Sequence, residues 1–532
     1  MLGDSSTPVA TTDAGQIARL LDDAKSRFAA GEIRESCGLA LQASELAREA
    51  ADTRALADAA LVVAAVPDPG AAAAVERMAG LALASVDQDQ LALRARLESQ
   101  LSVALHLREQ FEPAQKHAEL ALALAEQSGD LPALADALHA RGLAMAGTAE
   151  AGSLLALGDQ MLEAAIGCGA AGAELAARVW RVDALIRMGR TEQAGHEIDS
   201  IDVLAARSRS RLALWNAHLC RAGLYQAIGR LAEAESEARI ARDVLPASQR
   251  PHTEPLFIAQ LMLIATDLGQ EPAEIGAARA NAVGTSLIAV AMTGRYDLEM
   301  GDDAGAMVAF ESVRARIDRV QLDRRGLPTL AAELQLAVAA RDIAVVADLR
   351  RRLEPYADAM IASSLGAVGP VSYYLSAAEL ALGNIDAAIG HAQSAIELTA
   401  EGGFGPWLAR SRAIHAEALR ARGGADDMRR AAHSARLADI AAAQLGMVRL
   451  KARTAALVER LAARTRLSRR ELEIAGLVSD GLSNREISSA LGVAERTVET
   501  HVQNILTKLD FHSRTEVAAW VVREGIVADG GT

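Results

Sequence analysis

Apolar residues recur every three to four positions along most of the chain, and this period predicts a succession of amphipathic helices. Four of the turns between these helices share one pattern, a Gly followed five residues later by an Ala, at Gly189, Gly229, Gly301 and Gly383. Looser copies between them give a spacing close to 40 residues. A helix, a tight turn at Gly and a second helix that opens with a small residue make an α-hairpin, and about eleven such units predict a solenoid.

The segment 467–525 carries helix start and stop signals at a shorter spacing. A Ser stands three residues before a Glu in three pairs, which is the capping box that opens a helix; the pairs are Ser468 and Glu471, Ser483 and Glu486, and Ser513 and Glu516. Glycines that can take the left-handed conformation at a helix end follow at Gly481, Gly492 and Gly525. Four short helices are therefore predicted at 469–480, 484–491, 495–509 and 514–524.

The middle two of these helices are joined by Gly492-Val493-Ala494. A three-residue turn that contains Gly is the spacing that a helix-turn-helix needs. One face of 495–508 carries apolar residues for a small core. The opposite face carries polar side chains that can reach base edges and phosphates, namely Arg496, Glu499, Thr500, Gln503 and Lys508. This arrangement predicts a DNA-binding domain.

At these residues the sequence resembles the LuxR-type (NarL/FixJ-like) DNA-binding domain over about 60 residues. The matching runs are Leu467-Ser-Arg-Arg-Glu-Leu-Glu473, Gly481-Leu-Ser-Asn-Arg-Glu-Ile487, Arg496-Thr-Val-Glu-Thr-His501, and Lys508-Leu509 followed by Ser513-Arg-Thr-Glu516. The resemblance implies base contacts from Glu499, Thr500 and Gln503, phosphate contacts around Thr497 and Lys508, and dimerisation through the helix 514–524.

The candidate residues follow from the polar face and from this resemblance. The DNA-binding set is Ser483, Asn484, Arg496, Thr497, Glu499, Thr500, Gln503 and Lys508. The dimerisation set is the stripe Val517, Ala518, Trp520 and Val521.

Two positions depart from the pattern of the family. Ala494 stands where the family usually has a Ser or Thr cap, so the recognition helix lacks a bond worth about 1 kcal/mol. Glu499 occupies a position that is often basic, and a carboxylate can only accept hydrogen bonds, which cytosine N4 and adenine N6 donate in the major groove. We expect Glu499 to favour cytosine and Gln503 to favour adenine.

The composition supports helices throughout. Hydrophobic residues make up 51% of the 532 residues but aromatic residues only 3%, which suits closely packed helices better than sheets. The repeat units resemble tetratricopeptide repeats (TPR), although they exceed the usual 34 residues and lack the aromatic consensus positions. The predicted fold is all-α, with a TPR-like α-hairpin solenoid at 13–460, a four-helix helix-turn-helix domain at 461–526, and loose tails at 1–12 and 527–532.

The stretch from Gly383 to Gly424 resembles the helical repeats that precede the DNA-binding domain in large ATP-dependent LuxR-type regulators. Their nucleotide module needs a Gly-Lys pair in its phosphate loop, and none of the four lysines here follows a Gly. The first 120 residues have only helical period, without the strands of a phosphorylation receiver domain. We therefore expect neither an ATPase nor a receiver module.

The charge pattern leaves the electrostatics of DNA binding open. The net charge is −14, and 467–525 contains seven Arg and Lys residues against nine acidic ones. A basic run with Glu459 as its only acidic residue precedes this segment. The run either supplies positive charge near the DNA or is a solvated helix face. Its members are Arg449, Lys451, Arg453, Arg460, Arg464 and Arg466.

Other chemistry is expected to be absent. Cys37, Cys168 and Cys220 are widely spaced in helical contexts and are expected to be reduced thiols. No local arrangement suggests catalysis, a metal or a cofactor, and the lack of a signal peptide or a long apolar span predicts a cytoplasmic protein without membrane contact.

Two functional interpretations remain. In the first, the protein is a transcription regulator that binds double-stranded DNA as a homodimer, while its solenoid senses a ligand or partner such as RNA polymerase or another protein. In the second, it is a protein-interaction scaffold with an accessory DNA-binding domain. Residues at inner positions of the solenoid either contact a peptide or small-molecule effector or belong to the core: Trp180, Arg181, Trp215, His218, Tyr225, Tyr373, Tyr374 and Trp407.

Overall fold

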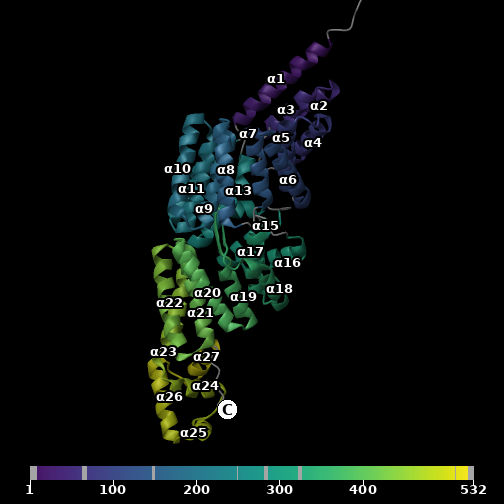
Figure 1. Cartoon of the computed structure of the whole chain (residues 1–532). Helices are drawn as coiled ribbons and strands as arrows, with labels where there is room; N and C mark the ends of the chain where they lie inside the picture. Colours follow the sequence, from purple (N-terminus) through teal and green to yellow (C-terminus); the bar gives the residue numbers. More distant parts are fainter. Residues whose placement is uncertain are drawn as a thin grey trace, which may run out of the picture.

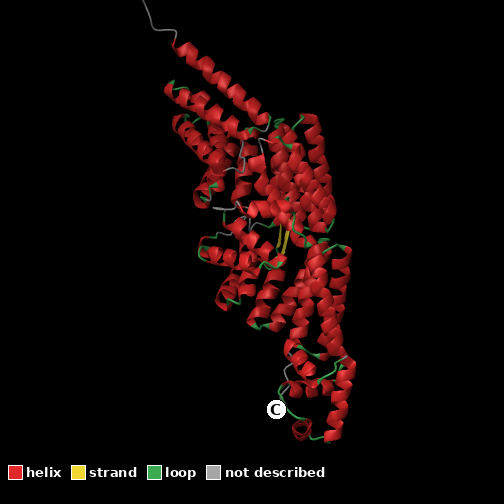
Figure 2. Cartoon of the chain, turned by 180° about the vertical axis from the view of Figure 1, so that it is seen from behind, coloured by secondary structure: helices red, strands yellow, loops and turns green. Residues whose placement is uncertain are grey.

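The computed structural model describes residues 9–30, 32–62, 69–108, 110–145, 150–247, 250–280, 286–320, 326–509 and 511–524. Residues 1–8 of the tail predicted at 1–12 lie outside the described ranges, whereas 9–12 already belong to the first helix. The tail predicted at 527–532 and the helix end at Gly525 also lie outside these ranges. Within the described ranges, the chain is a succession of helices with one short β-hairpin (Figures 1 and 2). None of the described helices is long and apolar enough to cross a membrane.

The first half of the solenoid is a stack in which each helix packs on its sequence neighbours. Its helices are α1 (Val9–Ala29), α2 (Ile33–Glu49), α3 (Thr53–Val62), α4 (Pro69–Ser85), α5 (Leu91–Leu107), α6 (Phe111–Ser128), α7 (Leu131–Met145), α8 (Ala151–Gly167), α9 (Ala171–Arg187), α10 (Thr191–Ser208), α11 (Arg211–Ile228), α12 (Leu231–Val244), α13 (Arg250–Leu268) and α14 (Ala273–Ala280).

The second half continues the stack and contains the hairpin. It consists of α15 (Leu287–Met300), α16 (Asp303–Arg314), a 3₁₀ turn at Ile317–Arg319, α17 (Gly326–Ala340), α18 (Ile343–Leu353), a 3₁₀ turn at Glu354–Tyr356, β1 (Met360–Ser363), β2 (Gly366–Pro370), α19 (Val371–Leu382), α20 (Ile385–Glu401), α21 (Gly405–Arg422), α22 (Ala425–Gln444) and α23 (Val448–Arg466).

The four glycines of the repeat pattern end helices as predicted. Gly189, Gly229, Gly301 and Gly383 have φ values of 70°, 91°, 81° and 81°, the left-handed conformation that closes a helix. In each case the next helix begins two residues later. The alanines five residues after these glycines are at most 1% exposed, namely Ala194, Ala234, Ala306 and Ala388. Small buried residues let the helices of each hairpin pack closely, and the prediction of an α-hairpin solenoid is confirmed.

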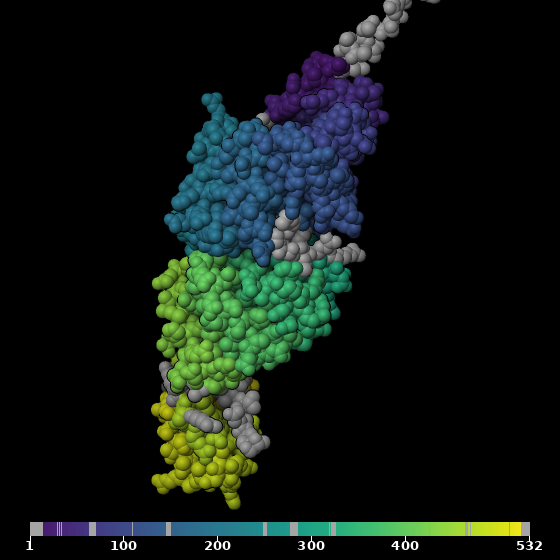
Figure 3. Space-filling model, in the orientation of Figure 1, coloured from purple at the N-terminus to yellow at the C-terminus, as the bar shows by residue number. Residues whose placement is uncertain are grey.

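The second half of the solenoid folds back on the first. Helices α9 and α11 contact the hairpin, while α11 also contacts α21, and α13 contacts α23. At the turn after α9, a Cβ on Gly189 would lie 2.5 Å from the Cα atom of Gly402. Figure 3 shows the blue first half and the green second half in contact, with the C-terminal domain in yellow at one end. The superhelix is therefore tightly wound and leaves its middle filled.

A two-stranded hairpin fills this middle, and the helical period did not predict it. Strands β1 and β2 pair antiparallel, with Met360 opposite Pro370 and Ser363 opposite Gly366, and a bulge follows Ile361. All five residues of β2 are buried. The segment is rich in Gly, Ala and Ser and lacks the alternation that marks a half-buried strand, because both of its faces are covered.

Side chains of the surrounding helices bind the backbone of the hairpin. Gln226 in α11 accepts a hydrogen bond from the Ala367 N–H (2.7 Å) and donates one to the Ala367 carbonyl (3.3 Å). Asp183 in α9 accepts from the Ser364 N–H (2.5 Å), and the indole of Trp407 in α21 donates to the Ala367 carbonyl (3.2 Å). These contacts satisfy buried backbone groups that a third strand would otherwise bind.

Two glycines allow this close approach. A Cβ on Gly223 in α11 would collide with the carbonyl oxygen of Ser364. Gly369 has a φ of 128°, and a Cβ there would lie 2.7 Å from the ring of Trp407. The hairpin therefore packs against glycine backbone on one side and against an indole ring on the other.

The C-terminal domain consists of four helices at one end of the solenoid (Figure 1): α24 (Arg469–Ser479), α25 (Asn484–Leu491), α26 (Glu495–Leu509) and α27 (Arg514–Glu524). The predicted four-helix domain is confirmed, with helix bounds within one residue. The expected domain boundary at 460/461 falls inside α23, because the helical period of that segment continues to Arg466. Leu457 and Leu461 of α23 pack in a core with α20, α21 and α22, so we place the boundary at Leu467.

We predict that Gln226→Ala destabilises the protein by about 3 kcal/mol, because it leaves the buried N–H and carbonyl of Ala367 without their amide partner. Urea unfolding of the full chain measures this change. Gln115→Ala, at an exposed glutamine of α6, is the matched control. Equal stability of the two variants would contradict the role of Gln226.

Glu333 in α17 predicts that the stability of the protein depends on pH. It is fully buried, neither carboxylate oxygen has a hydrogen-bond partner, and burial together with the charge of Glu311 raises its pKa from 4.5 to about 8. The folded protein therefore keeps this carboxyl protonated at pH values where the unfolded chain ionises it. Its contribution to the free energy of unfolding is greatest below pH 4.5 and falls as pH rises toward 8.

Glu333→Gln removes this dependence, so the variant is expected to gain stability over the wild type progressively between pH 5 and pH 8, by up to about 1.4 kcal/mol per pH unit. Urea midpoints across this range measure the difference. Glu401→Gln, at an exposed glutamate, should give a constant difference. A pH-independent gain for Glu333→Gln would show that the carboxyl does not titrate as described.

Candidate DNA-binding site

Helices α25 and α26 are held at a fixed turn. Gly492 has a φ of 65°, and the Val493 N–H donates to the Ser488 carbonyl (3.1 Å). Helix α26 starts without a side-chain acceptor at Ala494, whose carbonyl accepts from the Thr497 N–H (2.9 Å). Apolar side chains of α24, α25 and α26 meet in one core, including Ile474, Ile487, Val498, Val502 and Ile505.

The capping pattern positions these helices. Ser468 and Glu471 form a reciprocal capping box at α24, and Ser483 and Glu486 form one at α25. At α27, the Ser513 hydroxyl accepts from the Glu516 N–H (3.3 Å), but the Glu516 carboxylate accepts from the N–H of His512 (2.6 Å). Ser513 therefore caps its helix, but the Glu516 carboxylate bonds the residue before Ser513 instead of Ser513 itself.

One face of α26 is open to solvent. Arg496, Thr497, Glu499, Thr500 and Gln503 are all exposed, and neither the solenoid nor the other three helices of the domain cover them. The Thr500 hydroxyl donates to the Arg496 carbonyl (2.9 Å), which orients its methyl and oxygen on this face. The face offers donors and acceptors in a helix that stands at the end of the molecule.

Three other candidate residues have structural partners. Ser483 caps α25, and the Asn484 side-chain carbonyl accepts from Arg514 in α27 (2.7 Å). Lys508 pairs with the buried Glu471 at 2.7 and 2.9 Å. Burial alone would raise the pKa of the Glu471 carboxyl, but the bonds from Lys508 and Ser468 outweigh it and keep this pKa below its usual value.

The basic run before the domain faces the solenoid. Lys451 pairs with Asp439 (2.6 Å), Arg453 with Glu299 (2.8 Å) and Arg460 with Glu417 (3.2 Å). These three side chains are 39–56% exposed and also pair α23 with other helices of the solenoid. The side chains of Arg464 and Arg466 lie outside the described residues.

The stripe assigned to dimerisation requires a correction. Val517, Trp520 and Val521 are 1–3% exposed and pack in the core of the domain itself, and Ala518 is half buried against it. The apolar face of a helix has the same pattern whether it covers its own domain or a partner, so the sequence could not separate the two. On the outer face of α27, Val522 is 74% exposed.

The candidate groove residues are divided between core and surface contacts. Trp180, Tyr374 and Trp407 are buried. Arg181 pairs with Asp159 and Glu197, His218 lies 2.6 Å from Glu237, and Tyr225 stacks with Arg230, while Trp215 is half buried. Tyr373, Tyr374 and Trp407 form one cluster, with centroids 5.3 to 5.9 Å apart. This cluster joins α19 to α21 beside the hairpin.

Among the described residues, one group of side chains has the composition of a metal site, namely Glu354, Glu379 and His391. Arg350 contacts both carboxylates, at 3.1 Å from Glu354 and 2.6 Å from Glu379, and Asn384 donates to Glu379 (2.7 Å). The Arg350 guanidinium bridges the two carboxylates, so the contacts form an ion-pair network.

Comparison with known proteins agrees with this geometry. Residues 465–521 match the family described as bacterial regulatory proteins, luxR family. The chain is 44% identical over 61 residues to the transcriptional regulatory protein LiaR of Bacillus subtilis, 44% over 61 residues to DegU of Brevibacillus brevis, and 45% over 60 residues to the uncharacterized response regulatory protein YgeK of Escherichia coli. These segments are 11–12% of this chain and span 29%, 26% and 41% of the respective relatives.

Among solved structures, yeast Tom70 aligns over 97% of this chain and 98% of its own, at 13% identity and a TM-score of 0.28. This likeness is too weak to support an argument about function. The family match, by contrast, covers α24, α25, the turn, α26 and most of α27. Residues 465–521 are therefore a DNA-binding helix-turn-helix domain of the LuxR family of bacterial regulatory proteins.

Proposed function

We propose that this chain is a sequence-specific transcription regulator whose solenoid senses a ligand or a partner protein. The observation that carries the proposal is the exposed face of α26, which a helix-turn-helix places in the major groove. Base contacts are assigned to Glu499, Thr500 and Gln503, and backbone contacts to Arg496 and Thr497.

Ser483, Asn484 and Lys508 make structural bonds, and these bonds change the roles in DNA binding that we propose for them. Ser483 and Asn484 stand at the N-terminus of α25, where exposed N–H groups can meet a phosphate while the side chains hold the helix. Lys508 is 41% exposed and remains a positive charge near the DNA, but its ion pair with Glu471 weakens that contribution.

Helix α23 supports the sensing role. It packs on α13, α21 and α22 and also contacts α26. A change in the solenoid that moves α23 therefore reorients the DNA-binding domain. RNA polymerase or another protein is the proposed partner of the DNA-bound form. The alternative, a scaffold with an accessory DNA-binding domain, is favoured by the extent of the solenoid surface.

Selection from random DNA duplexes at physiological salt separates these functions. If the protein is a regulator, the full chain should enrich one DNA sequence. Removal of 467–532 should then abolish DNA binding, while the solenoid stays helical. Nonspecific, salt-labile binding by the full chain would favour the scaffold.

The side chains on α26 predict a base preference. Gln503→Ala should cost about 1 to 3 kcal/mol on the selected site only, because a bidentate contact to adenine is lost. Glu499→Ala should strengthen nonspecific binding and relax the preference for cytosine at one base pair, because it removes a charge that phosphates repel. Titrations on a panel of single-base variants of the site measure both effects.

Gln444→Ala, at an exposed glutamine of α22, is the control and should leave the whole panel unchanged. An equal loss on all sequences for Gln503→Ala would show that this residue contacts only the DNA backbone.

The homodimer is assigned to the outer face of α27. Val522→Glu should weaken binding to a site with two half-sites at least tenfold, because it places a charge in an apolar contact, and should leave binding to a single half-site intact. Val521→Glu is the contrasting variant, since it places a charge in the domain core and should unfold the domain. Unchanged two-half-site binding by Val522→Glu would exclude this face.

A further inference from the structure

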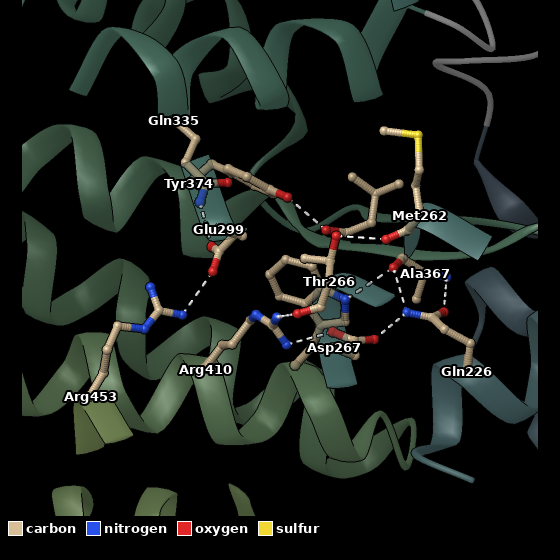
Figure 4. A network of polar contacts seen from close by, with 12 residues as sticks. Gln226, Met262, Thr266, Asp267, Glu299, Gln335, Ala367, Tyr374, Arg410 and Arg453 are labelled. Carbon is tan, nitrogen blue, oxygen red and sulfur yellow. Dashed lines mark hydrogen bonds and ion pairs between the residues drawn. The ribbon is translucent and has the colours of Figure 1, made fainter. Parts of the chain in front are cut away.

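A buried network of charges lies beside the hairpin, where α13, α15, α21 and α23 meet (Figure 4). Asp267 and Arg410 are each 3% exposed and bond at 2.6 Å. Glu299 is 8% exposed and accepts from Arg453 and from Gln335, both at 2.8 Å. Each carboxylate of the network thus has an arginine of its own.

A third arginine of the network has no such partner. Arg295 in α15 is 2% exposed, and its Nε atom has no hydrogen-bond partner. Among the described residues, no carboxylate or carbonyl bonds its guanidinium, which packs 5.5 Å from the ring of Trp407. The other carboxylate near it in sequence, Asp297, faces Gly305 in α16. Three guanidinium groups therefore share two carboxylates.

An uncompensated guanidinium is costly in a protein interior. Arginine cannot lose its proton in a protein, and an unpaired buried ion costs several kcal/mol. The planar fork of its N–H groups fits the two oxygens of a carboxylate or phosphate. Burial alone would raise the pKa of the neighbouring Glu299, but the charges of Arg453, Arg410 and Arg295 outweigh it and lower this pKa to about 2. The surroundings of Glu299 are thus strongly positive.

The border of the network is accessible on one side. The side chain of Arg453 is 56% exposed, and Tyr373, which touches Trp407 edge to face at 5.3 Å, is only half buried. Arg453 and Tyr373 therefore form the accessible border of the network, and Arg410 and Arg295 lie buried behind it.

We propose that Arg295 binds the oxyanion of a small organic acid, a carboxylate or phosphate group, at a site bordered by Trp407, Tyr373 and Arg453. The proposed site identifies the effector of the sensing role proposed above as a small organic anion. Only the expected effect of the anion on DNA binding rests on that role. An oxyanion here competes with Glu299 for Arg453, and Arg453 belongs to α23, the helix that leads into the DNA-binding domain.

Binding of the anion is tested without DNA. The unfolding temperature of the full chain is measured against sodium phosphate and sodium benzoate, with chloride holding the ionic strength constant. A saturable rise is expected with at least one of the two, and the responding salt identifies the phosphate or the carboxylate as the better group. A rise that equals that with chloride would overturn the site.

Two variants assign the binding to Arg295. Arg295→Met removes the charge and keeps an apolar stem, so it should raise the unfolding temperature without added anion and abolish the response to phosphate or benzoate. Arg351→Met, at a 71% exposed arginine of α18, should keep the wild-type response. A less stable Arg295→Met protein that still responds to the anion would show that Arg295 is a satisfied structural residue, and would overturn the proposal.

Affinity for the selected DNA site, with and without the responding anion, then reports on sensing separately. A shift of threefold or more that Arg295→Met abolishes supports both the site and its regulatory role. Anion binding that leaves DNA affinity unchanged supports the site and overturns the sensing role. Loss of DNA binding in all samples would count against the proposed regulator and not against the anion site.

Discussion

The structure of the solenoid depends on the hydrogen bonding of one buried hairpin. Two strands alone leave backbone N–H and carbonyl groups on both edges without a strand partner, and all five residues of β2 are buried. Asp183, Gln226 and Gln260 from α9, α11 and α13 supply the missing partners. The hairpin therefore ties three helices of the first half together, and Trp407 of the second half bonds the same hairpin.

This closure has a chemical consequence. A solenoid that winds openly keeps its inner charges in water, whereas here the ends of α13, α15 and α21 meet around the hairpin and enclose Asp267, Arg295 and Arg410. Charges enclosed in this way must be paired with one another or with something that enters from outside. At the border of this enclosed network, the side chain of Arg453 remains 56% exposed.

Features that depend on a few neighbouring residues could be predicted from the sequence, whereas contacts between distant segments could not. Gly189 and its counterparts end helices, and Ser468 and Ser483 begin them, because these effects need only local backbone. The hairpin has no local pattern, since its strands are stabilised by residues about 140 to 180 positions away, such as Gln226 and Asp183. The same limit applies to Val521 and Lys508. The chemical character of these side chains was clear from the sequence, but their partners in α24 are known only from the fold.

The junction between the solenoid and the DNA-binding domain is short. Leu467, the residue that ends α23, is 6% exposed and belongs to the core of the C-terminal domain. The next residue, Ser468, opens α24 by a capping box with Glu471, and the same carboxylate binds Lys508 near the end of α26. Helix α24 therefore begins three residues after α23 ends, and the buried Glu471 carboxylate links the start of α24 to Lys508 in α26. Under the sensing role proposed above, a displacement of α23 at Arg453 should therefore change the orientation of α26 relative to the solenoid.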